Sequence, residues 1–175
     1  MAVAIVRMNR RAAQALGDPA GIDAALPEDL LAPKLRGLIA EGLVRREGVL
    51  VFARHAEEIG NAPGNSPDRT GWECSVNTVH LDFIVPIAIG SPAAGEPVID
   101  DDAQVHLLRH GLGFAVEIVR LAGELDGPVP VRCIIGANST SGTFRFHRVR
   151  PGETWLVEDL DAYRGEMVAV VESMP

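Results

Sequence analysis

The stretch at residues 72–86, WECSVNTVHLDFIVP, constrains the fold more than any other part of the chain. In its second half the odd positions are mostly apolar, whereas the even positions carry a hydroxyl, an imidazole and a carboxylate at Thr78, His80 and Asp82. An alternation with a period of two is typical of a strand that buries one face. We therefore expect a central strand at residues 75–85 with a polar second face.

The elements after this strand can be placed in order along the chain. The spacing of apolar residues predicts a helix over 103–125, which the acidic run at 100–102 would cap. A short helix is expected at 154–163, and further strands are expected at 130–135, 143–150 and 167–172. The order β-α-β-β-α-β is that of ferredoxin-like folds. The sequence therefore predicts an α+β fold, with a four-stranded antiparallel sheet and helices on one face.

The first third of the chain reads as a helical and hairpin segment that precedes this body. A helix is expected over 3–16, although its first residues also suit the start of a strand. Residues 60–71, GNAPGNSPDRTG, are dense in loop-forming residues. We therefore expect an N-terminal segment over 1–59 that packs on a body over 72–175, with one compact domain overall.

Within the N-terminal segment, Pro33 suits the first position of a helix that ends at Gly42. Two short apolar runs around Glu47-Gly48 then predict a tight hairpin. A helix followed by GLVRREGVLVF resembles the recognition helix and wing of winged-helix proteins. The resemblance covers residues 27–54 and implies a DNA-binding regulator, for which the helix offers only Lys34 and Arg36 as basic contacts.

Composition and charge bound the class of protein. The chain of 175 residues is 47% hydrophobic and 23% charged, which is typical of one globular domain. No apolar run approaches the ~20 residues of a membrane helix, and no secretory signal is evident, so we expect a cytoplasmic protein without membrane contact. Residues 1–54 hold 8 basic and 6 acidic side chains, and residues 55–175 hold 8 basic and 18 acidic ones. Such an acidic body disfavours nucleic-acid binding.

The predicted sheet order brings further polar residues to the face that carries Thr78, His80 and Asp82. Phe144 and Phe146 of the third strand should face the helices, so the intervening positions should face the other way. The helix-free face is then expected to gather Thr78, His80, Asp82, Arg132, Arg145 and His147. Such a cluster suits a small anionic ligand or acid–base chemistry with an Asp-oriented histidine. The same residues also suit structural ion pairs or a face covered by a second subunit.

The long predicted helix carries the one spacing that resembles a metal motif. His106 and His110 are four residues apart, so their side chains lie on one helix face. They lie on the polar stripe of an otherwise apolar helix, and such stripes normally face solvent. Zinc binding by the pair is a weaker alternative, and we expect no cofactor.

No motif in the chain identifies a reaction. The sequence contains no Walker-type loop, no GxGxxG and no nucleophile elbow. We therefore expect a cytosolic, non-catalytic protein that acts by binding a protein partner or by self-assembly as a homodimer. The alternatives are a small-molecule-binding protein or enzyme that uses the polar sheet face, and a DNA-binding regulator that uses residues 27–54.

Overall fold

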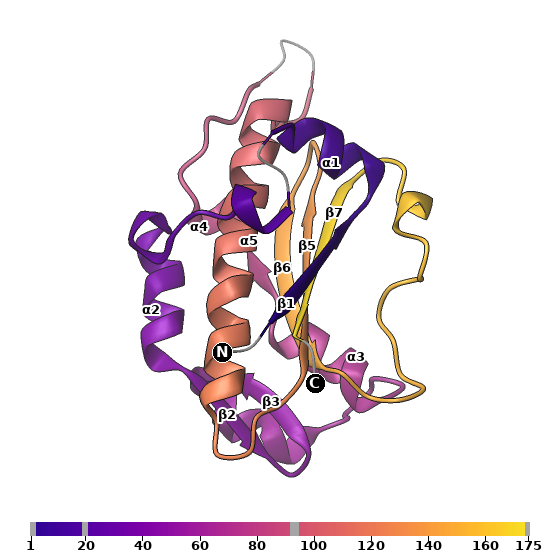
Figure 1. Cartoon of the computed structure of the whole chain (residues 1–175). Coiled ribbons are helices and arrows are strands. Elements are labelled where there is room, and N and C mark those ends of the chain that lie inside the picture. The colour runs from indigo at the N-terminus through magenta and orange to yellow at the C-terminus, as the bar shows by residue number, and fades with distance from the viewer. Residues whose placement is uncertain (1–2, 19–20, 92–94, 174–175) are drawn as a thin grey trace.

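The computed structural model describes residues 3–18, 21–91 and 95–173. Its central feature is a five-stranded antiparallel sheet in the order β1-β7-β5-β6-β4 (Figure 1). The strands of this sheet are β1 (Ala4–Met8), β4 (Val79–His80), β5 (Val131–Ala137), β6 (Gly142–Arg148) and β7 (Met167–Ser173). With several helices around this sheet, the protein is a mixed α+β fold.

The sheet has five strands instead of the expected four, because the N-terminal residues supply one of them. The four strands expected from the sequence correspond to β4, β5, β6 and β7, and they lie in the order β4-β6-β5-β7. A ferredoxin-like sheet would place the last of these beside the first, whereas β7 lies between β5 and β1. The ferredoxin-like order is therefore not confirmed.

Helix α5 (Asp101–Glu124) covers one face of the sheet, close to its expected range (Figure 1). The Asp100 side chain accepts a hydrogen bond from Ala103 N at 2.8 Å and caps the helix as expected. Leu107, Leu112 and Ile118 are fully buried against the sheet. A side chain at Gly113 would collide with the carbonyl oxygen of Leu26, so the N-terminal chain packs directly on the helix backbone.

The N-terminal residues form a strand and a helix instead of one helix. Ala4, Val6 and Met8 pack against the main core from β1, which pairs with β7. Helix α1 (Arg10–Leu16) then begins after Asn9, whose side-chain oxygen accepts from Ala12 N at 3.0 Å. The alternation of apolar residues before Asn9 and the cap that it provides explain the change from strand to helix.

The stretch expected to be a central strand is mostly helical. Residues 75–85 run from the end of helix α3 (Arg69–Val76) through the two-residue strand β4 and the single turn α4 (Leu81–Ile84). The Asp68 side chain accepts from Gly71 N at 2.7 Å and begins α3 inside the segment expected to be loop. Side chains of α3 contact two other segments of the chain. These contacts favour a helix over a strand.

The hairpin expected in the N-terminal segment is confirmed. Helix α2 (Pro33–Glu41) has proline in its first turn and ends at Gly42. Strands β2 (Leu43–Arg46) and β3 (Val49–Phe52) form a second, two-stranded sheet. Glu47 and Gly48 both have positive φ, as a two-residue hairpin turn requires. Aromatic rings join the hairpin to the main core, because Phe52 packs edge-on against Phe146 at 4.9 Å.

The remaining elements are short. They are four 3₁₀ segments: η1 (Gly21–Ala24), η2 (Glu28–Leu30), η3 (Ala53–Asn61) and η4 (Leu160–Ala162). The helix expected at 154–163 is wrong except for the three-residue turn η4, because the rest of this range has bends and irregular backbone. Within the described ranges, no helix is both long and apolar enough to cross a membrane.

Candidate functional site

The face of the sheet opposite α5 carries three of the residues expected to form a site. Arg132 of β5 lies directly opposite His147 of β6, and Arg145 lies two residues along the same strand. Facing residues of an antiparallel pair project to the same side of the sheet, and so do alternate residues of one strand. The structure therefore brings Arg132, Arg145 and His147 to one face, as expected.

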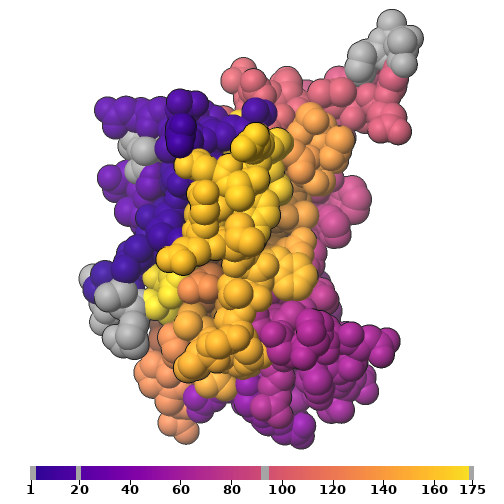
Figure 2. Space-filling view, turned by 90° about the vertical axis from the view of Figure 1, so that its right-hand side faces the viewer, coloured from indigo at the N-terminus to yellow at the C-terminus, as the bar shows by residue number. Residues whose placement is uncertain are grey.

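This face is not open, because the chain between β6 and β7 crosses it. We call residues 149–166 the covering segment; Figure 2 shows it in gold along this side of the molecule. Leu160 of the segment is buried with Val168 and Val170 of β7, which makes a small second core on this face. Leu156 and Tyr163 pack around this core and are partly buried. The sheet is therefore sandwiched between α5 and the covering segment.

Two hollows remain between the covering segment and the sheet. The first, which we call the Glu166 hollow, has a volume of about 350 Å³. Its polar and aromatic lining comes from Gly136, Thr143, Arg145, Trp155, Tyr163 and Glu166. The second, which we call the β1 hollow, has a volume of about 940 Å³ and lies beside the N-terminal strand. Its lining includes Ile5, Arg7, Arg132, Val157, Glu158 and Glu172.

The charged residues of the two hollows differ in their partners. In the β1 hollow, Arg132 Nε donates to Glu172 Oε2 at 2.8 Å, so these two charges neutralise each other. In the Glu166 hollow, the Arg145 guanidinium lies over the ring of Trp155, 5.2 Å from its centroid. Burial raises the pKa of Glu166, and the nearby charge of Arg145 opposes that change.

The three residues that were expected on the first strand lie away from this cluster, so this part of the prediction is wrong. The Thr78 hydroxyl donates to the carbonyl oxygen of Cys74 at 2.6 Å at the end of α3. Asp82 lies in α4, where its carboxylate accepts from Gly142 N at 3.1 Å. His80 is exposed and stacks on Phe83, with ring centroids 5.1 Å apart. The alternation that should have aligned these three residues is absent, because only two residues of the stretch are extended.

His147 is buried instead of facing a cavity. Its Nδ1 lies 2.6 Å from the carbonyl oxygen of Arg148, to which it donates, and its Nε2 has no hydrogen-bond partner among the described residues. Burial is the main cause that lowers the pKa of His147, so the ring is neutral at pH 7. His80 pairs with Thr143, four residues along β6 from His147, which corresponds to roughly 13 Å. Neither hollow contains either histidine.

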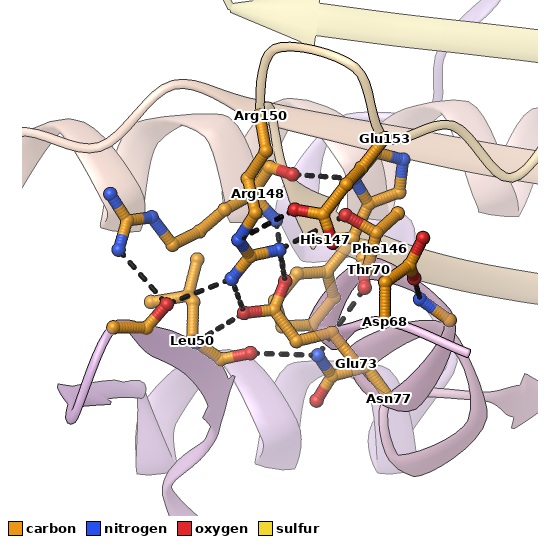
Figure 3. Close-up of polar contacts among 12 residues, drawn as sticks. Leu50, Asp68, Thr70, Glu73, Asn77, Phe146, His147, Arg148, Arg150 and Glu153 are labelled. Atoms are coloured by element: carbon orange, nitrogen blue, oxygen red, sulfur yellow. Dashed lines mark hydrogen bonds and ion pairs between the residues drawn. The ribbon is translucent and has the colours of Figure 1, made fainter. Parts of the chain in front are cut away.

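A buried carboxylate that the sequence did not single out lies between the hairpin and the main sheet. Glu73 of α3 is fully buried, and Arg150 pairs with both of its oxygens (Figure 3). The same carboxylate accepts from Leu50 N at 2.8 Å and from Arg148 N at 2.7 Å. Four donors therefore occupy the carboxylate, which leaves it no free position for a ligand.

Asn77 continues this network one helical turn after Glu73. Its amide donates to the carbonyl oxygens of Leu50 and Phe146, and its side-chain oxygen accepts from Phe52 N at 3.2 Å. Glu73 and Asn77 thus satisfy backbone groups of β3 and β6 that do not pair with each other. These contacts join the hairpin to the main sheet, and we interpret the network as structural.

The histidine pair on α5 adopts a defined geometry. His106 Nε2 and His110 Nε2 lie 3.2 Å apart, and His110 is buried while Ala32 N donates to its Nδ1 at 3.3 Å. Zinc sites in proteins normally use three or four protein ligands. The described part of the chain contains no group of three or more histidine, cysteine or acidic side chains placed to hold a metal.

The two cysteines are buried and unpaired. Burial raises the pKa of the Cys74 thiol to about 12 and raises that of Cys133 as well. Both thiols are therefore protonated at neutral pH, and neither has the thiolate character of a nucleophile.

The comparisons with known proteins bear on the C-terminal part of the chain. Residues 97–175 match the model of a family described as the Uncharacterized protein PM0498 family. This range is less than half of the chain and includes α5, β5, β6, the covering segment and β7. No curated protein and no solved structure matched the chain. Both hollows lie mainly within the matched range, and the family description names no activity.

Sequence reasoning missed the residues that complete the Glu166 hollow. Trp155 lies in the segment expected to form a helix, and Glu166 lies between that segment and the last expected strand, and no periodicity marks either residue. Gly136 follows the strand expected at 130–135, but in the structure it lies inside β5, where a glycine often marks the close approach of another group. A side chain at Gly136 would collide with Glu166 Oε1, so the glycine makes room for this carboxylate on the sheet.

Proposed function

We propose that the protein is a non-catalytic binding protein that assembles with a second copy of itself through the free edge of β1. The observation that supports this proposal is the outer edge of the five-stranded sheet. Strand β1 has β7 on one side, and no described residue outside the sheet bonds to the backbone of its other side. A strand edge with unpaired N–H and C=O groups is a template for pairing with another chain.

The hydrogen bonds of β1 define which backbone groups are free. Asn9 N, directly after the strand, donates to Val168 O at 2.9 Å. In an antiparallel pair the N–H and C=O groups of alternate residues point toward the neighbouring strand. The odd residues of β1 therefore bond to β7, and the backbone groups of Ala4, Val6 and Met8 point outward.

These outward groups favour one two-fold arrangement. If two β1 strands run antiparallel with Val6 opposite Val6, then Ala4 lies opposite Met8, and the pairs formed by these even residues use the outward groups. The two sheets then join into one continuous sheet. Such a contact uses the same surface on both subunits, as in most homodimers.

Charge and exposed apolar surface support a second copy as the occupant. In this register Ile5, which is 45% exposed, faces Arg7 of the other copy. Glu158 lines the hollow beside Ile5, so Arg7 would approach an acidic side chain there.

Substitution at the centre of the contact tests the proposal. Val6→Pro removes an outward N–H and leaves the bonds of the odd residues to β7 in place. We expect the unmodified protein to show twice the 18.7 kDa chain mass by size-exclusion chromatography with light scattering at micromolar concentration. The Val6→Pro variant should show the mass of the single chain.

Phe83→Ser provides the matched control. Phe83 is 77% exposed but lies in α4, beside β4 at the opposite edge of the sheet. Its replacement removes a larger exposed apolar side chain and should leave the dimer intact. A monomer mass for the unmodified protein at high micromolar concentration would refute the proposal. Equal dissociation by Phe83→Ser and Val6→Pro would also count against the β1 edge.

A further inference from the structure

The Glu166 hollow contains two opposite charges that do not pair with each other. Arg145 enters from β6, and Glu166 enters from the end of the covering segment, directly before β7. Among the described residues, neither the guanidinium nor the carboxylate takes part in a hydrogen bond or an ion pair, although the two charges influence each other. Opposite charges that face one cavity without contact suit a ligand that carries both complementary charges.

The environment of Glu166 favours a donor from a ligand. Its carboxylate is half-buried and lies against Gly136, where any side chain would displace it. A partly buried carboxylate without hydrogen bonds is costly, and an ammonium group would supply both charge and donors. Burial raises the pKa of Glu166 for the same physical reason.

The environment of Arg145 favours an acceptor. The guanidinium makes a cation–π contact with Trp155, and such a contact does not use the N–H groups as hydrogen-bond donors to an acceptor oxygen. A guanidinium edge matches a carboxylate with two parallel hydrogen bonds. Arg145 is half-buried, so such a pair would be stronger than one in open solvent.

We propose that the Glu166 hollow binds a small apolar α-amino acid, with the ligand carboxylate on Arg145 and the ligand ammonium on Glu166. The hollow of about 350 Å³ is at the lower end of the roughly 300–1,000 Å³ of small-molecule sites, which suits a single amino acid. Ile134, Leu156 and Val168 give it an apolar part against which an aliphatic side chain packs. This site is separate from the β1 edge, so the two proposals can fail independently.

Binding of L-leucine to the full chain, measured by isothermal titration calorimetry, tests the site. Two analogues separate the charges, because 4-methylpentanoate lacks the ammonium group and 3-methylbutylamine lacks the carboxylate. We expect leucine to bind and each analogue to bind at least about tenfold more weakly, which corresponds to one charged contact. These measurements use the unmodified protein and do not depend on the folding of any variant.

Variants assign the contacts to residues. Arg145→Gln and Glu166→Gln should each weaken leucine binding about tenfold or more, and Gly136→Ala should weaken it by displacing the Glu166 carboxylate. Arg132→Gln is the matched control, because Arg132 lies on the same sheet face and is paired with Glu172. Absence of heat with leucine, equal binding of leucine and both analogues, or equal loss in Arg132→Gln and Arg145→Gln would overturn the proposal.

Discussion

At the scale of single residues, the histidine pair on α5 shows how the fold fixes a protonation state. Because Ala32 N donates to His110 Nδ1, the proton of the neutral ring lies on Nε2 and points at His106 Nε2. Burial is the main cause that lowers the pKa of His110 to about 4, and the neighbouring His106 contributes. A second proton on His110 would face the amide of Ala32, so the folded protein resists its protonation.

This pKa predicts acid sensitivity. Between about pH 6.5 and about pH 4 the unfolded chain protonates this histidine whereas the folded protein does not. Stability present above pH 6.5 should therefore be lost as the pH falls to 4, by up to about 3 kcal/mol from this residue. In His110→Asn, whose side-chain oxygen can accept from Ala32 N, the free energy of unfolding in urea should fall less steeply over this range.

His80→Asn is the control for this prediction, because the ring of His80 is exposed in the folded protein. Part of the pH dependence should persist in His110→Asn, since burial also lowers the pKa of His147. The same slope in His110→Asn and in the unmodified protein would show that His110 does not control the acid sensitivity.

At the scale of elements, helix α3 joins two sheets that do not pair directly. Glu73 and Asn77, four residues apart, lie on one helix face and reach backbone groups of both β3 and β6. Arg150 supplies the charge that a fully buried carboxylate requires. The position of the hairpin on the main sheet therefore depends on one short helix.

We predict that Glu73→Gln destabilises the protein by about 3 kcal/mol, because it leaves the largely buried Arg150 without its counter-charge. Urea denaturation followed by far-UV circular dichroism measures this change. Glu124→Gln is the matched control, since Glu124 pairs with Arg120 on the exposed side of α5. That variant should lose less than about 1 kcal/mol. Equal losses in the two variants would contradict a structural role for the Glu73 network.

At the scale of the whole molecule, the hairpin and the sheet share one core. Phe52 of β3 stacks on Phe114 of α5 at 6.0 Å and packs against Phe146 of β6, so three distant segments meet in one aromatic cluster. Trp72 lies under the hairpin with Val49, whereas Trp155 lies on the covering segment. The two tryptophans therefore report on opposite parts of the molecule.

We predict that these parts unfold in a single transition, as expected for one cooperative domain. In Trp155→Phe the fluorescence reports on the hairpin side through Trp72, and in Trp72→Phe it reports on the sheet side through Trp155. In each variant the urea midpoint from fluorescence should coincide with the midpoint from circular dichroism. Separate midpoints within one variant would indicate that residues 1–59 and 72–175 unfold independently.

Elements with local signals could be predicted from the amino-acid sequence alone. Asp100 and the apolar period define α5, Pro33 and Gly42 bound α2, and Glu47-Gly48 fixes the hairpin. Capping groups, proline and positive-φ turns act within a few residues of the chain, so their effects can be read directly. The shared orientation of Arg132, Arg145 and His147 could also be read, because alternation along a strand is local.

Long-range contacts, and not local sequence, set the conformation of residues 72–86. Their apolar alternation fits a strand, but Glu73 and Asn77 find buried partners on β3 and β6 only when the stretch begins as a helix. The same holds for the Glu166 hollow, which joins a glycine of β5, an arginine of β6 and a carboxylate before β7. The first feature depends on which distant backbone groups need hydrogen-bond partners. The second depends on where a segment without periodicity crosses the sheet. Local sequence spacing encodes neither of these long-range relations.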